Sequence, residues 1–244
     1  MRLVVLGGCG AWPTRGKPCS GYLVDHDGFR LLIDPGYGTM TQLPEKITPG
    51  QIDAVFVSHG HPDHYADLHP LLRARVLEGL EELSVYTIPG AIEPVLDLDG
   101  RGELKGAYEL VEFSPGDRFD IGPFDARTHL LPHFVPNAGL RLEAGEKVIA
   151  YTGDTGPDPA ISTLARQADV FVAEATFPNT VPDRFRGFLC SARDAGEVAA
   201  DAEVGQLVLT HLWPGTDERD VVASAREEFA GELVVALPGL TVDE

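Results

Sequence analysis

Cysteine is scarce in this chain of 244 residues, which contains only Cys9, Cys19 and Cys190. An odd and scattered set of cysteines does not form a disulfide framework. None of the three belongs to a Cys-x-x-Cys pair, so a structural zinc site built on thiolates is not expected. Cysteine usage of this kind is typical of a reducing compartment, and we therefore predict a cytoplasmic protein.

Long apolar runs are also absent. The apolar stretch near the N-terminus, Leu3–Leu6, is too short for the hydrophobic core of a signal peptide and resembles a buried strand. No other run approaches the length that crosses a membrane. The sequence therefore predicts that the protein has no membrane partner.

Basic residues are few compared with acidic ones. Lysine and arginine number 19 against 38 aspartates and glutamates, which makes the net charge −19. Proteins that bind nucleic acid usually have the opposite balance, because phosphates attract lysine and arginine. The acidic excess makes nucleic acid an unfavoured partner, but it is compatible with a small phosphate ester held by a metal. The predicted partner is a small-molecule substrate, and a homodimer is compatible with the sequence.

Short apolar runs punctuated by glycine and proline predict many strands, and helices follow the strands in each half of the chain. This order predicts an α/β fold: one four-layer αββα sandwich of two mixed β-sheets flanked by helices, as a single domain over residues 1–244. The expected strands are Leu3–Leu6, Tyr22–Val24, Phe29–Ile33, Ala54–Val57, Arg127–Leu131, Leu140–Glu143, Lys147–Tyr151, Val170–Ala173, Leu207–Leu209 and Leu233–Ala236. The expected helices are Tyr65–Leu80, with Leu68, Leu71, Leu72, Val76 and Leu80 on one face, Ser191–Ala202, capped by its serine, and Asp217–Phe229.

Three histidines and an aspartate crowd into six residues after the strand Ala54–Val57. The segment reads Ser58-His59-Gly60-His61-Pro62-Asp63-His64. Neutral imidazoles and carboxylates bind zinc at about 2.0–2.2 Å, so side chains that share one ion must converge. His59 and His61 can point to one side of an extended segment, and Pro62 then turns the last two potential ligands toward a neighbouring point. Core packing does not explain such a cluster, and the spacing predicts two adjacent metal ions.

The pattern His-x-His-x-Asp-His after a hydrophobic strand resembles the signature of the metallo-β-lactamase superfamily, and further motifs follow in the family's order. Asp34 in Leu-Ile-Asp-Pro-Gly resembles the early aspartate that supports the ligands without binding metal. His133 in Leu-Pro-His-Phe resembles the third ligand histidine, with His129 as an alternative near the same strand end. Asp154 in Gly-Asp-Thr-Gly resembles the bridging aspartate, and His211 in Leu-Thr-His-Leu resembles the last ligand.

The resemblance implies two divalent metal ions. The implied ligands are His59, His61 and His133 for one ion, Asp63, His64 and His211 for the other, and Asp154 as the bridge. Nitrogen and oxygen ligands without a thiolate suit zinc best, and manganese or iron are further options because affinity alone does not set metal identity. Two cations roughly 3.5–4 Å apart lower the pKa of a bridging water, and Asp63 would orient the resulting hydroxide as well as bind metal.

Within the superfamily, the chain is most similar to the ribonuclease Z and phosphodiesterase branch, through Gly-Asp-Thr-Gly around Asp154 and Ala-Glu-Ala-Thr-Phe around Glu174. In that branch Glu174 would pair with a histidine that protonates the leaving group, so Glu174 is a candidate catalytic residue. The histidine is missing here, because Leu189 occupies its position. Cys190 is one conceivable substitute, although such a cysteine is more commonly a small buried hydrophobe. Glu174 could equally be a buried carboxylate with a local partner.

These observations predict a binuclear metal-dependent hydrolase, a phosphodiesterase that cleaves a small phosphodiester such as a cyclic nucleotide by means of a metal-bridging hydroxide. The alternative is a hydrolase of a thioester, lactone or other ester on the same site. Processing of transfer RNA 3′ ends is less favoured, because residues 78–118 are acidic where that branch would carry a basic arm. A non-catalytic binding protein is disfavoured by the intact ligand set.

Overall fold

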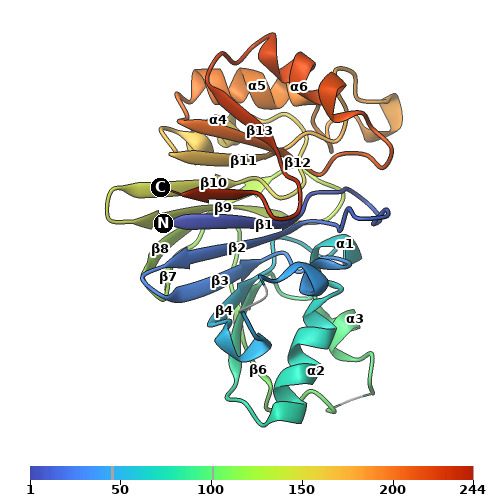
Figure 1. Ribbon diagram of the computed structural model, residues 1–244, viewed down its shortest axis with the longest axis vertical. Helices are drawn as coiled ribbons and strands as arrows, with labels where there is room; N and C mark the ends of the chain where they lie inside the picture. The colour runs from blue at the N-terminus through green and yellow to red at the C-terminus, as the bar shows by residue number, and fades with distance from the viewer. Residues whose placement is uncertain (45–46, 101, 244) are drawn as a thin grey trace.

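The computed structural model describes residues 1–44, 47–100 and 102–243 of the chain. Two seven-stranded sheets lie against each other in the middle of the molecule, and helices lie on their outer sides (Figure 1). The predicted α/β sandwich of two mixed sheets flanked by helices is therefore confirmed.

The first sheet has the strand order β14-β1-β2-β3-β4-β5-β6. The pairs from β14 through β1 and β2 to β3 are antiparallel. The pairs from β3 through β4 and β5 to β6 are parallel. The strands of this sheet are β1 (Arg2–Gly7), β2 (Gly21–His26), β3 (Phe29–Ile33), β4 (Ala54–Phe56), β5 (Leu83–Thr87), β6 (Tyr108–Glu112) and β14 (Thr241–Asp243).

The second sheet has the order β13-β12-β11-β10-β9-β8-β7. It is antiparallel from β7 to β10 and parallel from β10 to β13. Its strands are β7 (Arg118–Ile121), β8 (Phe124–Leu131), β9 (Asn137–Ala144), β10 (Lys147–Tyr151), β11 (Val170–Glu174), β12 (Gln206–Thr210) and β13 (Glu232–Val235).

Helices connect the parallel strands, as the geometry of parallel crossovers requires. Helices α4, α5 and α6 follow β10, β11 and β12 in turn and lie above the second sheet in Figure 1, whereas α1, α2 and α3 lie beside the first. The helices are α1 (Pro62–Tyr65), α2 (Leu68–Glu78), α3 (Glu93–Leu96), α4 (Pro159–Ala165), α5 (Ala192–Asp201) and α6 (Glu218–Arg226), with short 3₁₀ turns η1 (Thr39–Gln42), η2 (Pro49–Gln51) and η3 (Asp183–Phe185).

The main hydrophobic core joins the two sheets. Tyr22 on β2 and Tyr151 on β10 are buried with ring centroids 5.0 Å apart, so residues of both sheets meet across the interface. A second core, which includes Phe171 of β11 and Val221 of α6, lies between the second sheet and its helices. Because both sheets are packed on rigid cores, the loops at their strand ends are held in fixed positions.

The helix predicted over Tyr65–Leu80 is wrong in its extent. The structure has two helices there, because the backbone N–H of Asp67 donates to the carbonyl of Pro35 at 2.8 Å and so interrupts the helical ladder. The predicted buried face is also wrong at Val76, which is 38% exposed. Arg75 occupies the inner face of this turn instead, where its guanidinium donates to the carbonyls of Pro49, Ile52 and Glu81.

All ten predicted strands are present with small shifts of their ends, but four strands were missed. These are β5, β6, β7 and β14, of which β6 and β7 have no fully buried run for a sequence pattern to reveal. The predicted cap of α5 is confirmed, since the hydroxyl of Ser191 accepts from the Asp194 N–H at 3.2 Å. In the described ranges, helices of the length and apolarity needed to cross a membrane do not occur.

Candidate metal centre

Seven side chains predicted as metal ligands come together at one end of the two sheets. His59, His61, Asp63 and His64 lie on the loop after β4 and the start of α1, whereas His133 follows β8, Asp154 follows β10 and His211 follows β12. Each thus lies shortly after the end of a strand, where the packed sheet holds the backbone in place.

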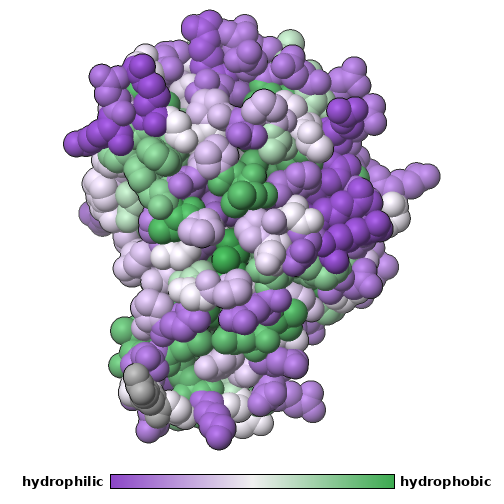
Figure 2. Space-filling view, turned by 180° about the vertical axis from the view of Figure 1, so that it is seen from behind, coloured by the Kyte–Doolittle hydropathy of each residue, from purple (hydrophilic) through white to green (hydrophobic). Residues whose placement is uncertain are grey.

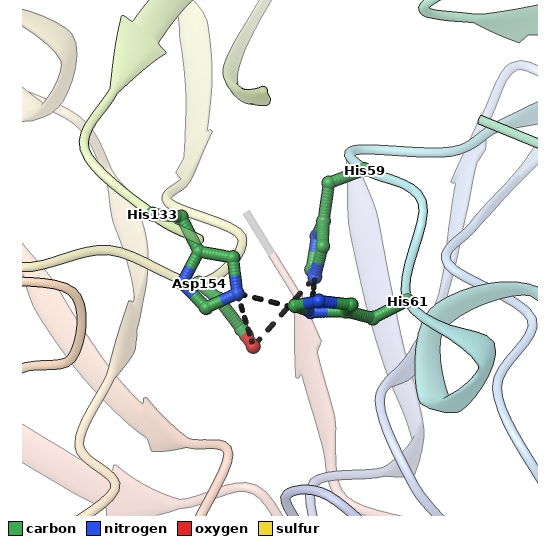
Figure 3. A group of neighbouring side chains, drawn as sticks. All are labelled: His59, His61, His133 and Asp154. Carbon is green, nitrogen blue, oxygen red and sulfur yellow. Dashed lines mark hydrogen bonds and ion pairs between the residues drawn. The ribbon is translucent and has the colours of Figure 1, made fainter. Parts of the chain in front are cut away.

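The first group of donors contains His59, His61, His133 and Asp154. Their side chains approach one another from opposite loops in Figure 3, with His59 and His61 on one side and the other two on the other. Nδ1 of His61 lies 3.1 Å from Nε2 of His59 and 3.0 Å from Nε2 of His133. Oδ2 of Asp154 lies 3.7 Å and 3.6 Å from the same two Nε2 atoms.

The second group contains Asp63, His64, His211 and again Asp154. Nε2 of His64 lies 3.2 Å from Oδ1 of Asp154, and Nε2 of His211 lies 3.1 Å from Oδ2 of Asp154. Oδ2 of Asp63 is 3.4 Å from Nε2 of His211 and 3.8 Å from Nε2 of His64. Asp154 is the residue that these two groups share.

The donor spacing fits a small tetrahedral cation. Ligand atoms about 2.0–2.2 Å from a tetrahedral zinc are about 3.3–3.6 Å apart, and the donor separations given above run from 3.0 to 3.8 Å. Two buried atoms in the centre, Nε2 of His64 and Oδ1 of Asp154, also have no hydrogen-bond partner. A buried polar atom without a partner is costly, and a bound cation would satisfy both of these atoms.

Asp34 fixes the segment after β4 that carries the first four donors. Its carboxylate accepts from the Ser58 N–H at 2.7 Å, the Ser58 hydroxyl at 2.6 Å, the Tyr151 hydroxyl at 2.7 Å and Nδ1 of His64 at 2.7 Å. Because the Ser58 hydroxyl donates to Asp34, its oxygen accepts from Nδ1 of His59 at 3.0 Å. Nδ1 of both imidazoles is therefore held by a hydrogen bond, which leaves Nε2 facing the centre as the atom that would bind a cation.

A second support holds His211. The Thr176 hydroxyl donates to Oε1 of Glu174 at 2.5 Å, so its oxygen accepts from Nδ1 of His211 at 2.8 Å. Glu174 is buried and also accepts from the backbone N–H groups of Thr155 and Cys190. Its contacts in the described structure are thus with neighbouring loops, and it reaches His211 through Thr176. Thr176 and Ser58 are supporting residues that the motifs did not reveal, although both stand inside the motifs that carry the resemblance.

Charge states differ between the two groups. In the first, burial lowers the pKa of His59, His61 and His133, which keeps these imidazoles neutral and able to bind metal. In the second, burial also opposes the charged form, but the carboxylates of Asp154 and Asp34 together outweigh it and raise the pKa of His64.

The pKa of His211 is raised in the same way, because the carboxylates of Asp154 and Asp63 together outweigh burial. Burial opposes ionisation of Asp154, yet the surrounding imidazoles outweigh burial and hold the pKa of Asp154 well below its usual range. Protons thus neutralise the second group in the absence of a cation, and a divalent ion would displace them. Burial raises the pKa of Glu174 to about 8, since its hydrogen bonds only partly offset the loss of solvation.

Backbone strain occurs in the same loops. Asp34 and His211 both have positive φ angles, 48° and 58°, which are unfavourable for residues with a side chain. Gly153, next to Asp154, has φ 60°, and a Cβ there would lie 2.3 Å from Oδ1 of Asn137. Strain of this kind persists where the surrounding structure enforces it, and it commonly marks functional sites.

The structure separates the two histidines that competed for the third position in the first group. His133 lies in the cluster, with Nδ1 donating to the carbonyl of Phe188 at 2.9 Å. His129 lies on β8 opposite Gly139, where burial and the nearby Arg141 and Arg127 lower its pKa, and it belongs to neither donor group.

Leu189 and Cys190 are both buried, and the backbone N–H of Cys190 donates to Glu174 at 3.1 Å. Burial raises the pKa of the Cys190 thiol well above its ordinary value, so it is a neutral thiol and a poor nucleophile. Leu189 places an aliphatic side chain at the position where the resemblance would put a proton-donating histidine.

Comparison with known proteins agrees with this geometry. The model of the β-lactamase superfamily domain matches residues 29–212. The probable metallo-hydrolase YhfI of Bacillus subtilis is 28% identical over 244 residues, which cover 98% of this chain and 98% of YhfI. The crystal structure of YhfI superposes with a TM-score of 0.91 at 27% identity, covering 100% of this chain and 98% of that one.

Ribonucleases Z are further relatives. Ribonuclease Z of Myxococcus xanthus is 30% identical over 304 residues, covering 100% of this chain and 97% of the relative. The short form of human tRNase Z has a TM-score of 0.77 at 23% identity, covering 100% and 99% of the two chains, and shows the shared fold. With its two donor groups, its fold and these relatives, the chain belongs to the metallo-β-lactamase superfamily and is a metal-dependent hydrolase.

Proposed function

We propose that the protein is a dinuclear phosphodiesterase that acts on a small phosphodiester such as a cyclic nucleotide. The observation that carries this proposal is the pair of four-donor groups that share Asp154. In the proposed assignment, one cation binds His59, His61 and His133, the other binds Asp63, His64 and His211, and Asp154 bridges them. The donor set contains nitrogen and oxygen only, and zinc suits it best.

The bound cations would polarise the phosphoryl oxygens and lower the pKa of an attacking water. The chain's own contribution is to fix the donors before substrate binds. Asp63 is held by the backbone N–H of Ala11, which donates to its Oδ2 at 2.8 Å. We propose that Asp63, besides binding metal, orients the attacking water. Glu174 would act through Thr176, which holds His211, and is in this proposal a positioning residue.

Phosphodiesters are favoured over other esters because a relative that spans the whole chain, ribonuclease Z of Myxococcus xanthus, carries the name of an enzyme class that breaks phosphodiester bonds. A small substrate is favoured by the net charge of −19. The acidic side chains of residues 78–118 support the same choice, because they would repel a long polyanion.

A substrate panel tests the proposal. Protein loaded with Zn²⁺ or Mn²⁺ is assayed with bis(4-nitrophenyl) phosphate, 3′,5′-cyclic AMP, a thioester and a lactone. We expect metal-dependent hydrolysis of the two phosphodiesters and much slower reaction of the carbonyl esters. Faster turnover of the thioester or lactone would replace the phosphodiesterase assignment with the alternative, and no turnover of any substrate would favour a binding protein.

Thr176 provides a test of the second metal position. Changing Thr176 to Val keeps its shape but removes the hydroxyl that holds Nδ1 of His211. Supports of this kind typically contribute 10–100-fold to metal affinity, so we expect the second metal equivalent to bind roughly 10–100-fold more weakly. A competitive titration with a chromogenic chelator measures this change. Thr176→Ser retains the hydroxyl and should restore the affinity, whereas equal affinities in all three proteins would contradict the support.

Precursor transfer RNA should be a poor substrate. The net negative charge of the protein repels a polyanion, and this repulsion is strongest at low salt. We expect kcat/KM for precursor transfer RNA to lie at least about 10-fold below that for the small phosphodiester, because steering of this kind changes association rates by about 10–10³. Cleavage assays with 3′-extended RNA at 50 and 200 mM salt provide the comparison. Efficient 3′-end cleavage at moderate salt would show that the protein acts on RNA.

A further inference from the structure

Six aromatic side chains form a continuous arc beside the metal centre. Neighbouring rings are in contact along the whole arc. The centroid separations are 5.2 Å for Trp12–Trp213, 5.5 Å for Trp213–Phe177, 5.5 Å for Trp213–Phe185, 6.4 Å for Phe185–Phe134 and 4.4 Å for Phe134–Phe188. Four separate loops supply these rings, so the arc exists only in the folded chain.

Both ends of the arc are attached to the metal centre. At one end, Trp12 follows Ala11, whose N–H donates to Asp63 at 2.8 Å. At the other end, the ring of Phe134 lies 5.1 Å from that of His133, and the carbonyl of Phe188 accepts from the same histidine. A group held by the arc would therefore lie next to a phosphate held at the centre.

The outer rings of the arc are exposed. Trp12 is 48% exposed, Phe134 is 49% exposed and Phe188 is 39% exposed, whereas the rings between them are partly buried. Single exposed apolar residues are common, but contiguous ones usually mark a binding surface. Figure 2 shows one face of the molecule, on which hydrophobic patches lie among hydrophilic side chains. Stacked inner rings support exposed outer rings, which is the arrangement of an aromatic platform.

The charge around the arc limits the size of its occupant. Arg184 lies 4.6 Å from the ring centroid of Phe185 and supplies a cation at this point. The chain as a whole carries a net charge of −19, which disfavours a long nucleic acid strand. A single planar heteroaromatic ring joined to one phosphodiester suits both the platform and the charge.

We propose that the arc is a base-binding subsite, in which its exposed rings, Trp12 at one end and Phe134 at the other, flank the nucleobase of a nucleoside phosphodiester whose phosphate lies at the metal centre. This proposal rests on the proposed phosphodiesterase function and names its substrate class. Stacking of a base on an aromatic side chain is sequence-tolerant, because every base has a π-face. The subsite therefore favours substrates that carry a base over base-free ones, and it discriminates only weakly between different bases.

Intrinsic fluorescence measures binding independently of catalysis. The chain has two tryptophans, and both Trp12 and Trp213 are in the arc. We expect AMP to quench the fluorescence of the metal-loaded protein saturably, and ribose 5-phosphate to leave it unchanged. Trp12→Phe should retain AMP binding with a smaller signal. Quenching of equal size and midpoint by the two phosphates would overturn the subsite.

Kinetics provide the second measurement. The ratio of kcat/KM for 3′,5′-cyclic AMP to that for a base-free ribose 3′,5′-cyclic phosphate isolates the contribution of the base. Trp12→Ala and Phe134→Ala should each lower this ratio about 5-fold or more, mainly through KM, given the usual strength of base stacking. Leu77→Ala is a matched control, because Leu77 is an exposed apolar residue on α2 at 74% exposure.

The outcomes separate the two proposals. If no phosphodiester is cleaved, the proposed function fails, and the AMP titration still decides on the arc. If phosphodiesters are cleaved but both alanine variants keep the wild-type ratio, the base-binding subsite is refuted while the function stands. Alanine variants that change the sedimentation of the protein without changing the ratio would identify the arc as a contact between copies of the chain, and would also refute the subsite.

Discussion

Asp154→Ala is expected to reduce kcat/KM for a small phosphodiester by at least about 10³-fold. Asp154 belongs to both donor groups, with Oδ1 3.2 Å from His64 and Oδ2 3.1 Å from His211. The substitution removes a ligand from each proposed cation. It also removes the negative charge that lies next to the imidazoles of His64 and His211. Metal ions supply several kcal/mol of transition-state stabilisation, and about 1.4 kcal/mol corresponds to a tenfold change in rate.

Three measurements make this prediction specific. Elemental analysis should show a fall from about two metal equivalents to one or fewer, since two structured sites need two complete ligand sets. Circular dichroism should show that the fold is retained. Asp158→Ala is the matched control, because Asp158 lies on the same loop but caps α4 by accepting from the Ala160 N–H. Near-normal activity of Asp154→Ala at saturating metal would show that the ligand assignment is incorrect.

Metal-stripped protein is expected to be inactive and to regain activity as Zn²⁺ is added, with a break at about two equivalents per chain. The two donor groups cannot be served by one small cation, because tetrahedral zinc takes four ligands. Binding should also stabilise the fold, by about 2.7 kcal/mol per site when free metal is 100 times the dissociation constant. Activity, metal content and thermal melting followed in the same titration would show all three effects.

The two histidines after β8 supply the control for this titration. His133→Ala should weaken the first site, because His133 lies 3.0 Å from Nδ1 of His61. His129→Ala should titrate like the wild type, because His129 lies outside both donor groups. A single break at one equivalent in the wild type, or a loss of metal in His129→Ala, would require a different assignment. Replacing Zn²⁺ by Mn²⁺ or Fe²⁺ in the same experiment identifies the preferred metal.

The fold could be predicted to the level of its layers. Alternating and continuous apolar runs marked strands such as Lys147–Tyr151, which the structure reproduces residue for residue. The helix after the His-rich segment was predicted too long, because a hydrogen bond between Asp67 and Pro35 stops it. Apolar periodicity shows which residues favour a helix, but it does not show that a distant carbonyl will take an N–H from the ladder.

The sequence by itself determined the cluster of ligand types after β4, because spacing within six residues is a local property of the chain. It also supplied the cap at Ser191, since a capping box involves residues only three apart. These features need no knowledge of how the sheets pack.

Only the tertiary structure decided how the distant parts meet. It brought His133 next to His59 and His61, the ligand set that the resemblance had implied, and it joined Glu174 to His211 through Thr176. It also assembled the aromatic arc from four loops. In each case the partners lie on different strand ends, and their distance depends on the packing of two sheets. Local preferences along a chain do not determine that packing, because contacts between residues far apart in sequence are set by the fold as a whole.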